Sequence, residues 1–182
     1  MKNNITNMTF RVQLYLTSGL IIVFILISPN IMGRNVNVSD FGAVGDASTL
    51  NTKALQEAIN TCTQTGGGEV IVPPGIYLTG TIFLRDNVEL RLCRGAVIRG
   101  SHRNPEDYPA FSVIMADSIE NAGISGQGII DGNARHPEFQ KRYQLNDGKR
   151  PHAIFYRDCK RMTLRNAVSY THLRAHETVL DL

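Results

Sequence analysis

The stretch that decides the fold is residues 66–100, GGGEVIVPPGIYLTGTIFLRDNVELRLCRGAVIRG. Short runs rich in β-branched residues alternate in it with corners made of Gly, Pro, Asn and Asp. Runs of this length between turn residues are typical of β-strands. Within residues 88–92 (VELRL) apolar and charged side chains alternate, so one face of this strand is predicted to point inward.

The same pattern returns farther along the chain. A shift of 32 residues places Ile82 on Ile114, and the same shift places Leu92 on Ile124. A further shift of 40 residues places Ile114 on Ile154. Strand-length repeats at a drifting spacing predict a coil of strands joined by loops of variable length, which is a parallel β-helix. The fold class predicted from the residues is therefore all-β.

One segment, residues 51–63 (NTKALQEAINTCT), has the apolar periodicity of an α-helix. Asn51 or Thr52 can cap its start, and Gly66 is expected to end it. A stack of strands leaves an apolar end and free strand edges that need covering. We therefore predict that this helix caps the N-terminal end of the coil. Residues 36–41, just before it, are expected to form a short strand.

The first 33 residues have the features of a secretory signal peptide. Lys2 and Arg11 precede an apolar run at residues 14–27, and a polar exit follows. The run is shorter than the roughly 20 residues that span a bilayer. We predict a signal peptide over 1–33, with an uncleaved N-terminal anchor as the alternative. The protein is then expected to be secreted or periplasmic, without stable membrane association after cleavage.

The end of the chain breaks the strand pattern. After Ala167 the sequence VSYTHLRAHETVLDL has neither Gly or Asn corners nor strand alternation. Its part SYTHLRAHET resembles translated sequencing-adapter sequence. The predicted organisation is thus a signal peptide, the N-terminal part of a β-helix domain over 34–167, and a non-native tail over 168–182.

Charge is distributed unevenly along the chain. Residues 34–134 carry 7 basic and 11 acidic side chains, whereas residues 135–165 carry 9 basic and 3 acidic ones. A basic surface favours an anionic partner, and an ordinary solvated loop is the alternative. The Gly-rich start of the deciding stretch runs into a strand and has no phosphate-loop motif. We therefore do not expect nucleotide binding at this loop. No nucleic-acid partner is predicted either.

No metal site or cofactor is predicted. The three cysteines have spacings unlike those of a zinc site, and we interpret them as small buried hydrophobic residues: Cys62, Cys93 and Cys159. The sequence leaves open whether Cys62 and Cys93 pair. The tail contains HLRAHE, whose possible metal ligands are His172, His176 and Glu177. Their order differs from the HExxH motif of zinc proteases, so no metal site is predicted there.

Several motifs taken together resemble one family. They are DFGAVGD at 40–46, the run at 66–92, GAVIRGS at 95–101, GQGIIDG at 126–132 and RPHAIFYRDC at 150–159. The combined pattern, over residues 36–166, resembles the N-terminal part of glycoside hydrolase family 28, the polygalacturonases and rhamnogalacturonan hydrolases. The resemblance implies a right-handed parallel β-helix with an N-terminal helical cap, truncated here.

The resemblance also implies a chemistry for which this chain lacks the residues. Family members cleave glycosidic bonds in pectin with inversion: one carboxylic acid protonates the leaving oxygen while a carboxylate base activates water. The family motifs Asn-Thr-Asp, Asp-Asp, Gly-His-Gly and Arg-Ile-Lys do not occur in this sequence. We therefore predict no catalytic residue, assign no substrate-binding residue, and interpret three aspartates as corner residues: Asp117, Asp131 and Asp158.

The expected function is that of the N-terminal part of a secreted hydrolase. Its expected partner is an anionic pectic polysaccharide, the chain alone is expected to be inactive, and the full-length protein is expected to be a monomer. Two alternatives remain at this stage. A pectate lyase would need clustered acids for Ca²⁺, and the only adjacent acids are Glu106 and Asp107. The other alternative is a non-catalytic β-helix that binds carbohydrate or serves as an adhesin.

Overall fold

The computed structural model describes residues 35–102, 107, 109, 112–133, 136–137 and 152–170, together with strands β1 (Arg11–Thr17) and β2 (Leu20–Leu26). The chain divides into two units, Met1–Met32 and Gly33–Leu182. In the first unit, β1 and β2 pair antiparallel, and they cover most of the apolar run. Among the described residues, no helix is long and apolar enough to cross a membrane. The signal peptide stays a prediction.

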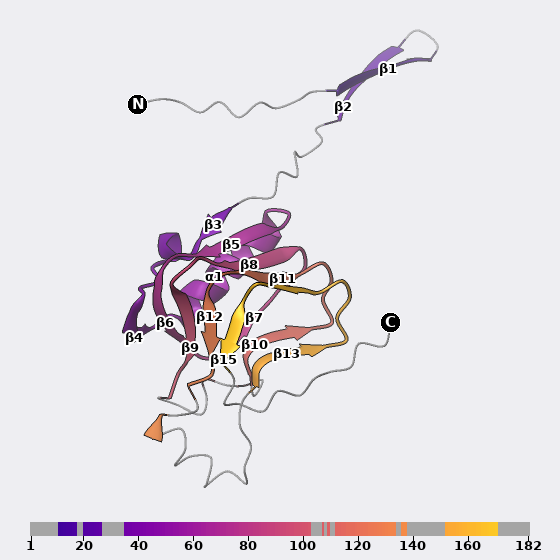
Figure 1. Ribbon diagram of the computed structural model, residues 1–182. Coiled ribbons are helices and arrows are strands. Elements are labelled where there is room, and N and C mark those ends of the chain that lie inside the picture. The colour runs from indigo at the N-terminus through magenta and orange to yellow at the C-terminus, as the bar shows by residue number, and fades with distance from the viewer. Residues whose placement is uncertain are drawn as a thin grey trace, which may run out of the picture. The chain divides into compact units, whose positions relative to one another are not determined.

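The second unit is a coil of short parallel strands (Figure 1). Three parallel sheets run along it, and we name each after one member. The β8 sheet has the order β14-β11-β8-β5-β3, the β9 sheet β15-β12-β9-β6-β4, and the β10 sheet β13-β10-β7. Each full coil gives one strand to each sheet, as β8, β9 and β10 do.

The strand bounds follow the predicted runs closely. In the β8 sheet they are β3 Val36–Asn37, β5 Gly68–Val72, β8 Val88–Leu92, β11 Gly123–Gly126 and β14 Thr163–Arg165. In the β9 sheet they are β4 Asp46–Leu50, β6 Gly75–Thr79, β9 Ala96–Gly100, β12 Ile129–Asp131 and β15 Val168–Tyr170. In the β10 sheet they are β7 Ile82–Phe83, β10 Ser112–Asp117 and β13 His152–Arg157.

The strand registers confirm most of the predicted repeat. Ile114 pairs with Ile82 on one side and with Ile154 on the other. One predicted pair is wrong, because Ile124 pairs with Leu90 and not with Leu92, so the shift in the β8 sheet is 34 residues. The reason is that turns differ in length between coils. Residues 93–95 separate β8 from β9, whereas only residues 127–128 separate β11 from β12.

Inward side chains of successive coils stack into ladders. The longest ladder runs Val36, Val70, Leu90, Ile124 and Leu164, each paired with the next in the β8 sheet. Its first four members are buried and belong to one hydrophobic core, whereas Leu164 on the last described coil is 53% exposed. The alternation predicted for residues 88–92 is observed, since every second residue there is buried. Burial of aliphatic side chains against like side chains is therefore what joins one coil to the next.

Helix α1 (Thr52–Gln64) covers the N-terminal end of the coil, as predicted. Its apolar face is buried in the core. Gln56 also closes the free edge of β7: its Oε1 accepts from the Phe83 N–H at 2.7 Å, and its Nε2 donates to the Phe83 carbonyl at 3.0 Å. A neighbouring strand would bind the same kind of backbone groups, so one side chain takes the place of a strand at this edge.

Two local predictions near this helix need correction. Asn51 precedes the helix, but its side chain makes no capping bond. It is buried and instead bonds the Val44 N–H at 2.7 Å and the Thr49 carbonyl at 2.7 Å, which satisfies backbone groups of the preceding loop. The strand expected over 36–41 is only two residues long. A short 3-10 helix, Val38–Phe41, follows because the Asn37 side chain accepts from the Ser39 N–H and begins the turn.

A ladder of corner residues lines the turns that lead into β8, β11 and β14. Asn87, Asn121 and Arg161 have positive φ values of 59°, 54° and 53°. The Asn121 amide donates to Asn87 Oδ1 at 3.2 Å, and Arg161 Nε donates to Asn121 Oδ1 at 2.6 Å. Asparagine tolerates left-handed backbone better than most residues, so the two asparagines fit these corners.

The β9 sheet extends beyond the boundary predicted at Ala167. Strand β15 (Val168–Tyr170) pairs in parallel with β12. The strand pattern thus continues for three residues into the segment that was expected to be foreign. Residues 171–182, including His172, His176 and Glu177, lie outside the described residues, and the origin of this tail stays a prediction.

Two substitutions in the same ladder test the stacked core. Leu90→Ala removes a fully buried side chain, so we expect a loss of about 2–5 kcal/mol in the free energy of unfolding. Leu164→Ala is the matched control at an exposed rung, where the loss should stay below about 1 kcal/mol. Urea-induced unfolding measures both. Equal losses would contradict the burial of this ladder.

Candidate functional site

Asp117 lies at the end of β10, and it binds to the next coil. Its carboxylate accepts a hydrogen bond from Arg157 Nε at 3.0 Å, a second one from the same guanidinium, and one from Ser118 Oγ at 3.1 Å. The hydrogen bond from Arg157 lowers the pKa of Asp117 below its ordinary value. A general acid must hold a proton before it can donate one. This environment therefore favours the predicted structural role.

The other two aspartates also lie at the ends of strands. Asp131 ends β12, where its carboxylate accepts from Arg99 Nε at 3.0 Å and from the Asn133 N–H at 2.8 Å. Asp158 follows β13, is exposed and has a φ of 50°, as expected of a corner residue. The structure does not gather the three aspartates on one sheet, because Asp117 and Asp131 end strands of different sheets.

The basic C-terminal segment is joined to earlier coils by ion pairs. The described basic residues after Arg150 each lie against an acid, in the pairs Arg157–Asp117, Lys160–Glu120, Arg161–Glu120 and Arg165–Glu89. Much of the positive charge in this segment is therefore neutralised by the coil beneath it. The other residues of the predicted basic segment, 135 and 138–151, lie outside the described residues.

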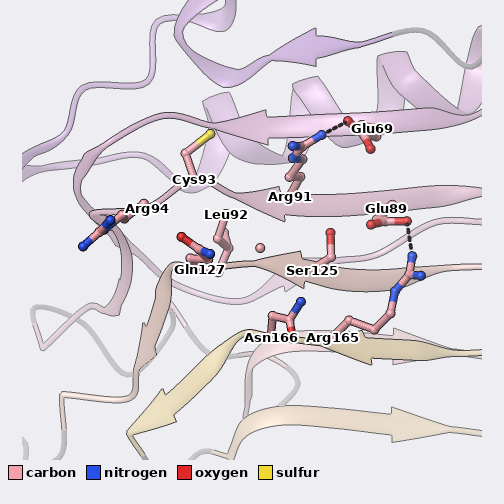
Figure 2. Close-up of a pocket in the computed structure, with 11 residues that line it drawn as sticks. Glu69, Glu89, Arg91, Leu92, Cys93, Arg94, Ser125, Gln127, Arg165 and Asn166 are labelled. Carbon is pink, nitrogen blue, oxygen red and sulfur yellow. Dashed lines mark hydrogen bonds and ion pairs between the residues drawn. The ribbon is translucent and has the colours of Figure 1, made fainter.

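A groove of about 580 Å³ lies on the outer face of the β8 sheet (Figure 2). We call it the β8 groove. It is lined by Glu69, Glu89, Arg91, Leu92, Cys93, Arg94, Ser125, Gly126, Gln127, Arg165 and Asn166. These residues come from β5, β8, β11 and β14 and from the turns that follow, so the groove crosses four successive strands of one sheet.

The β11 residues that line the groove, Ser125 and Gly126, are small, and the nearby Gly123 on the same strand has no side chain. Gly123 pairs with Glu89 on one side and Thr163 on the other, and Ser125 pairs with Arg91 and with a second arginine on β14. A Cβ at Gly123 would come 2.6 Å from the Thr163 carbonyl oxygen, so a side chain does not fit there. The longer side chains of β8 and β14 therefore form walls on either side of a low floor.

Two ion pairs hold the walls of the β8 groove. Arg91 lies 3.0 Å from Glu69, and Arg165 reaches across β11 to within 3.4 Å of Glu89. Figure 2 shows both pairs as dashed contacts. The third arginine, Arg94, is exposed in the turn between β8 and β9 and makes no ion pair with any residue that the structure describes. The lining of the groove thus has three guanidinium groups and two carboxylates, which leaves one positive charge in excess.

Sequence reasoning placed Glu89 and Arg91 on the outer face of their strand but did not find the groove. Its floor depends on which residue of β11 lies beside each residue of β8, and the predicted register was wrong by two residues there. Cys93 at its edge is partly exposed, as is Cys159, so burial as a small hydrophobic residue holds for Cys62 alone. No disulfide joins these three residues, all of which lie in the described part of the chain.

Comparison with known proteins gives the family. The sequence model of the family described as rhamnogalacturonase A/epimerase, pectate lyase-like matches residues 35–170. The chain belongs to this family. The match begins where the described β-helix begins and ends with β15, so it covers the described strands of the second unit. It also confirms the resemblance of the sequence to glycoside hydrolase family 28.

Individual relatives agree with this assignment. The chain is 34% identical over 119 residues to an exo-poly-alpha-D-galacturonosidase of Dickeya chrysanthemi, and 41% identical over 121 residues to a probable polygalacturonase of Vitis vinifera. Each match covers 54% of this chain and 19% or 24% of the relative. The chain therefore spans about a fifth of the length of these relatives.

A solved structure agrees in fold. The family 28 exopolygalacturonase of Yersinia enterocolitica matches with a TM-score of 0.63 and 25% identity, over 82% of this chain and 36% of that one. The predicted fold, a right-handed parallel β-helix with an N-terminal capping helix, is confirmed by this likeness together with the sheet order.

Removal of one guanidinium tests the electrostatics of Asp117. In Arg157→Ala the carboxylate loses its main hydrogen-bond donor, so its pKa should rise toward the ordinary aspartate value. Carbon-detected NMR titration of the Asp117 carboxyl measures this shift. Arg99→Ala, which removes the partner of Asp131 instead, is the control and should leave Asp117 unchanged. An unchanged Asp117 pKa in Arg157→Ala would contradict the assigned pairing.

Proposed function

We propose that this chain is the N-terminal part of a secreted hydrolase that cleaves glycosidic bonds of an anionic pectic polysaccharide with inversion. The observation that carries the proposal is the family match over 35–170, together with relatives that are galacturonan-cleaving enzymes by name. The full-length protein is proposed to act as a monomer outside the cytoplasm, without a stable membrane attachment and without a nucleic-acid partner.

The role of the chain in that protein follows from its architecture. Helix α1 closes one end, and the coils present three continuous sheets on which further coils can stack in the same register. We propose that this part forms the rigid base of the enzyme, on which the coils that cut the polysaccharide stack.

The catalytic pair is proposed to lie outside residues 1–182. Inverting glycosidases need two carboxyl groups about 6.5–9.5 Å apart, one protonated and one ionised, with room for a water molecule between them. Asp117 and Asp131 are instead each held by a basic side chain of a neighbouring coil. Such pairs connect coils and leave no free acid-base couple at those positions.

Activity measurements test both parts of the proposal. The purified chain 1–182 should release no reducing ends from polygalacturonate, because it lacks the acid and the base. The complete protein that carries this chain should release them, and the product first formed should have the inverted anomeric configuration by proton NMR. Release by chain 1–182 itself would contradict the absence of catalytic residues. An unsaturated product from the complete protein would indicate a lyase and overturn the proposed hydrolysis.

A further inference from the structure

The β8 groove has the chemistry of a binding site for one acidic sugar unit. We propose that it is an accessory carbohydrate site, which holds a uronate residue of a polysaccharide without cleaving it. The inference deepens the proposed function and rests on it for the class of ligand. It concerns the outer face of the β8 sheet, whereas the catalytic pair was proposed to lie outside residues 1–182.

The charge of the groove fits a single carboxylate. Of its three arginines, Arg91 and Arg165 are each held by a glutamate, and Arg94 alone remains without an ion-pair partner among the described residues. A guanidinium binds a carboxylate through two parallel hydrogen bonds, and such charge-assisted bonds are stronger than neutral ones. One excess positive charge suits one sugar acid better than a phosphate cluster, which would need several free cations.

The remaining lining suits sugar hydroxyl groups. Ser125 offers a hydroxyl, and Gln127 and Asn166 offer amides that can both donate and accept hydrogen bonds. Figure 2 shows Ser125 on β11, Gln127 near the end of that strand and Asn166 beside β14. Arg94 lies on the turn beyond Gln127, and its guanidinium points away from these three side chains, so it would have to swing toward them to reach a bound sugar. Because they come from two successive coils, a sugar bound there would touch β11 and the turn after β14 at the same time.

The groove is held open by the fold itself. Its floor is strand backbone with small side chains, and its walls are braced by the Arg91–Glu69 and Arg165–Glu89 pairs. A volume of about 580 Å³ is within the range of ordinary small-ligand sites, roughly 300–1,000 Å³. A site formed before the ligand arrives loses less entropy on binding, which favours recognition by a few polar contacts.

Binding of trigalacturonate to the chain tests the inference without any need for catalysis. Isothermal titration of chain 1–182 should give saturable binding, and the methyl ester of the same trisaccharide, which lacks the charges, should bind more weakly. Arg94→Ala should weaken trigalacturonate binding by about ten- to a hundredfold, the range for one lost charge-assisted contact. Gln127→Ala should weaken both the acid and the ester, because it loses a contact with a hydroxyl group.

Arg85→Ala is the matched control. It removes another exposed arginine, which contacts Asn60 of the capping helix and does not line the groove, so binding should be unchanged. Circular dichroism checks that each variant keeps its fold. Absence of binding by the unaltered chain, equal binding in Arg94→Ala, or equal binding of acid and ester would each overturn the inference.

The outcome separates this inference from the proposed function. If the complete protein cleaves polygalacturonate but the groove variants bind normally, only the accessory site fails. If Arg94→Ala loses binding while the complete protein hydrolyses no polygalacturonate, the accessory site stands and the proposed hydrolysis fails.

Discussion

The parallel register between successive coils is the constraint on which the rest of the structure depends. It places Ile114 between Ile82 and Ile154 in one sheet, and Ile124 between Leu90 and Leu164 in another. Because side chains alternate between the two faces of a strand, the same register that stacks the apolar ladders inside also sets which charges meet outside. Coil-to-coil ion pairs and the β8 groove are therefore consequences of the same strand pairing.

The two ends of the described coil differ in what covers their strand edges and core side chains. At the N-terminal end, Gln56 binds both backbone groups of Phe83, and the helix buries its apolar face against the core. At the other end, Leu164 continues a buried ladder but is itself half exposed. An aliphatic side chain at the end of such a ladder gains its full burial only when another coil lies over it. Burial at each end therefore depends on a covering element, which the helix supplies at the N-terminal end and which Leu164 lacks in the described structure.

Much of this fold could be predicted from the sequence because its information is local and repeated. The alternation in VELRL, the Gly and Asn corners and the helical spacing of residues 51–63 are each visible within a few residues. The parts that failed depend on contacts between distant segments. Turn lengths differ between coils, so Ile124 pairs with Leu90 and not with the predicted Leu92. The Asn51 side chain bonds backbone groups of the preceding loop and does not cap the helix.

The candidate site was harder to foresee for the same reason. The groove has Ser125 between arginines of two other strands, and the pair Arg165–Glu89 joins residues 76 positions apart in sequence. No spacing rule within one strand predicts that contact. The aspartates, in contrast, could be interpreted from their own surroundings, since corner positions and nearby turn residues are visible locally.

The most direct measurement of the central claim is a set of NMR contacts between the methyl groups of three isoleucines. Selective labelling of isoleucine methyl groups should give strong nuclear Overhauser contacts from Ile82 to Ile114 and from Ile114 to Ile154. It should give none of similar strength from Ile82 to Ile154, because one strand lies between them. A direct Ile82–Ile154 contact, or the lack of both neighbouring contacts, would contradict a coil in which each turn lies on the one before.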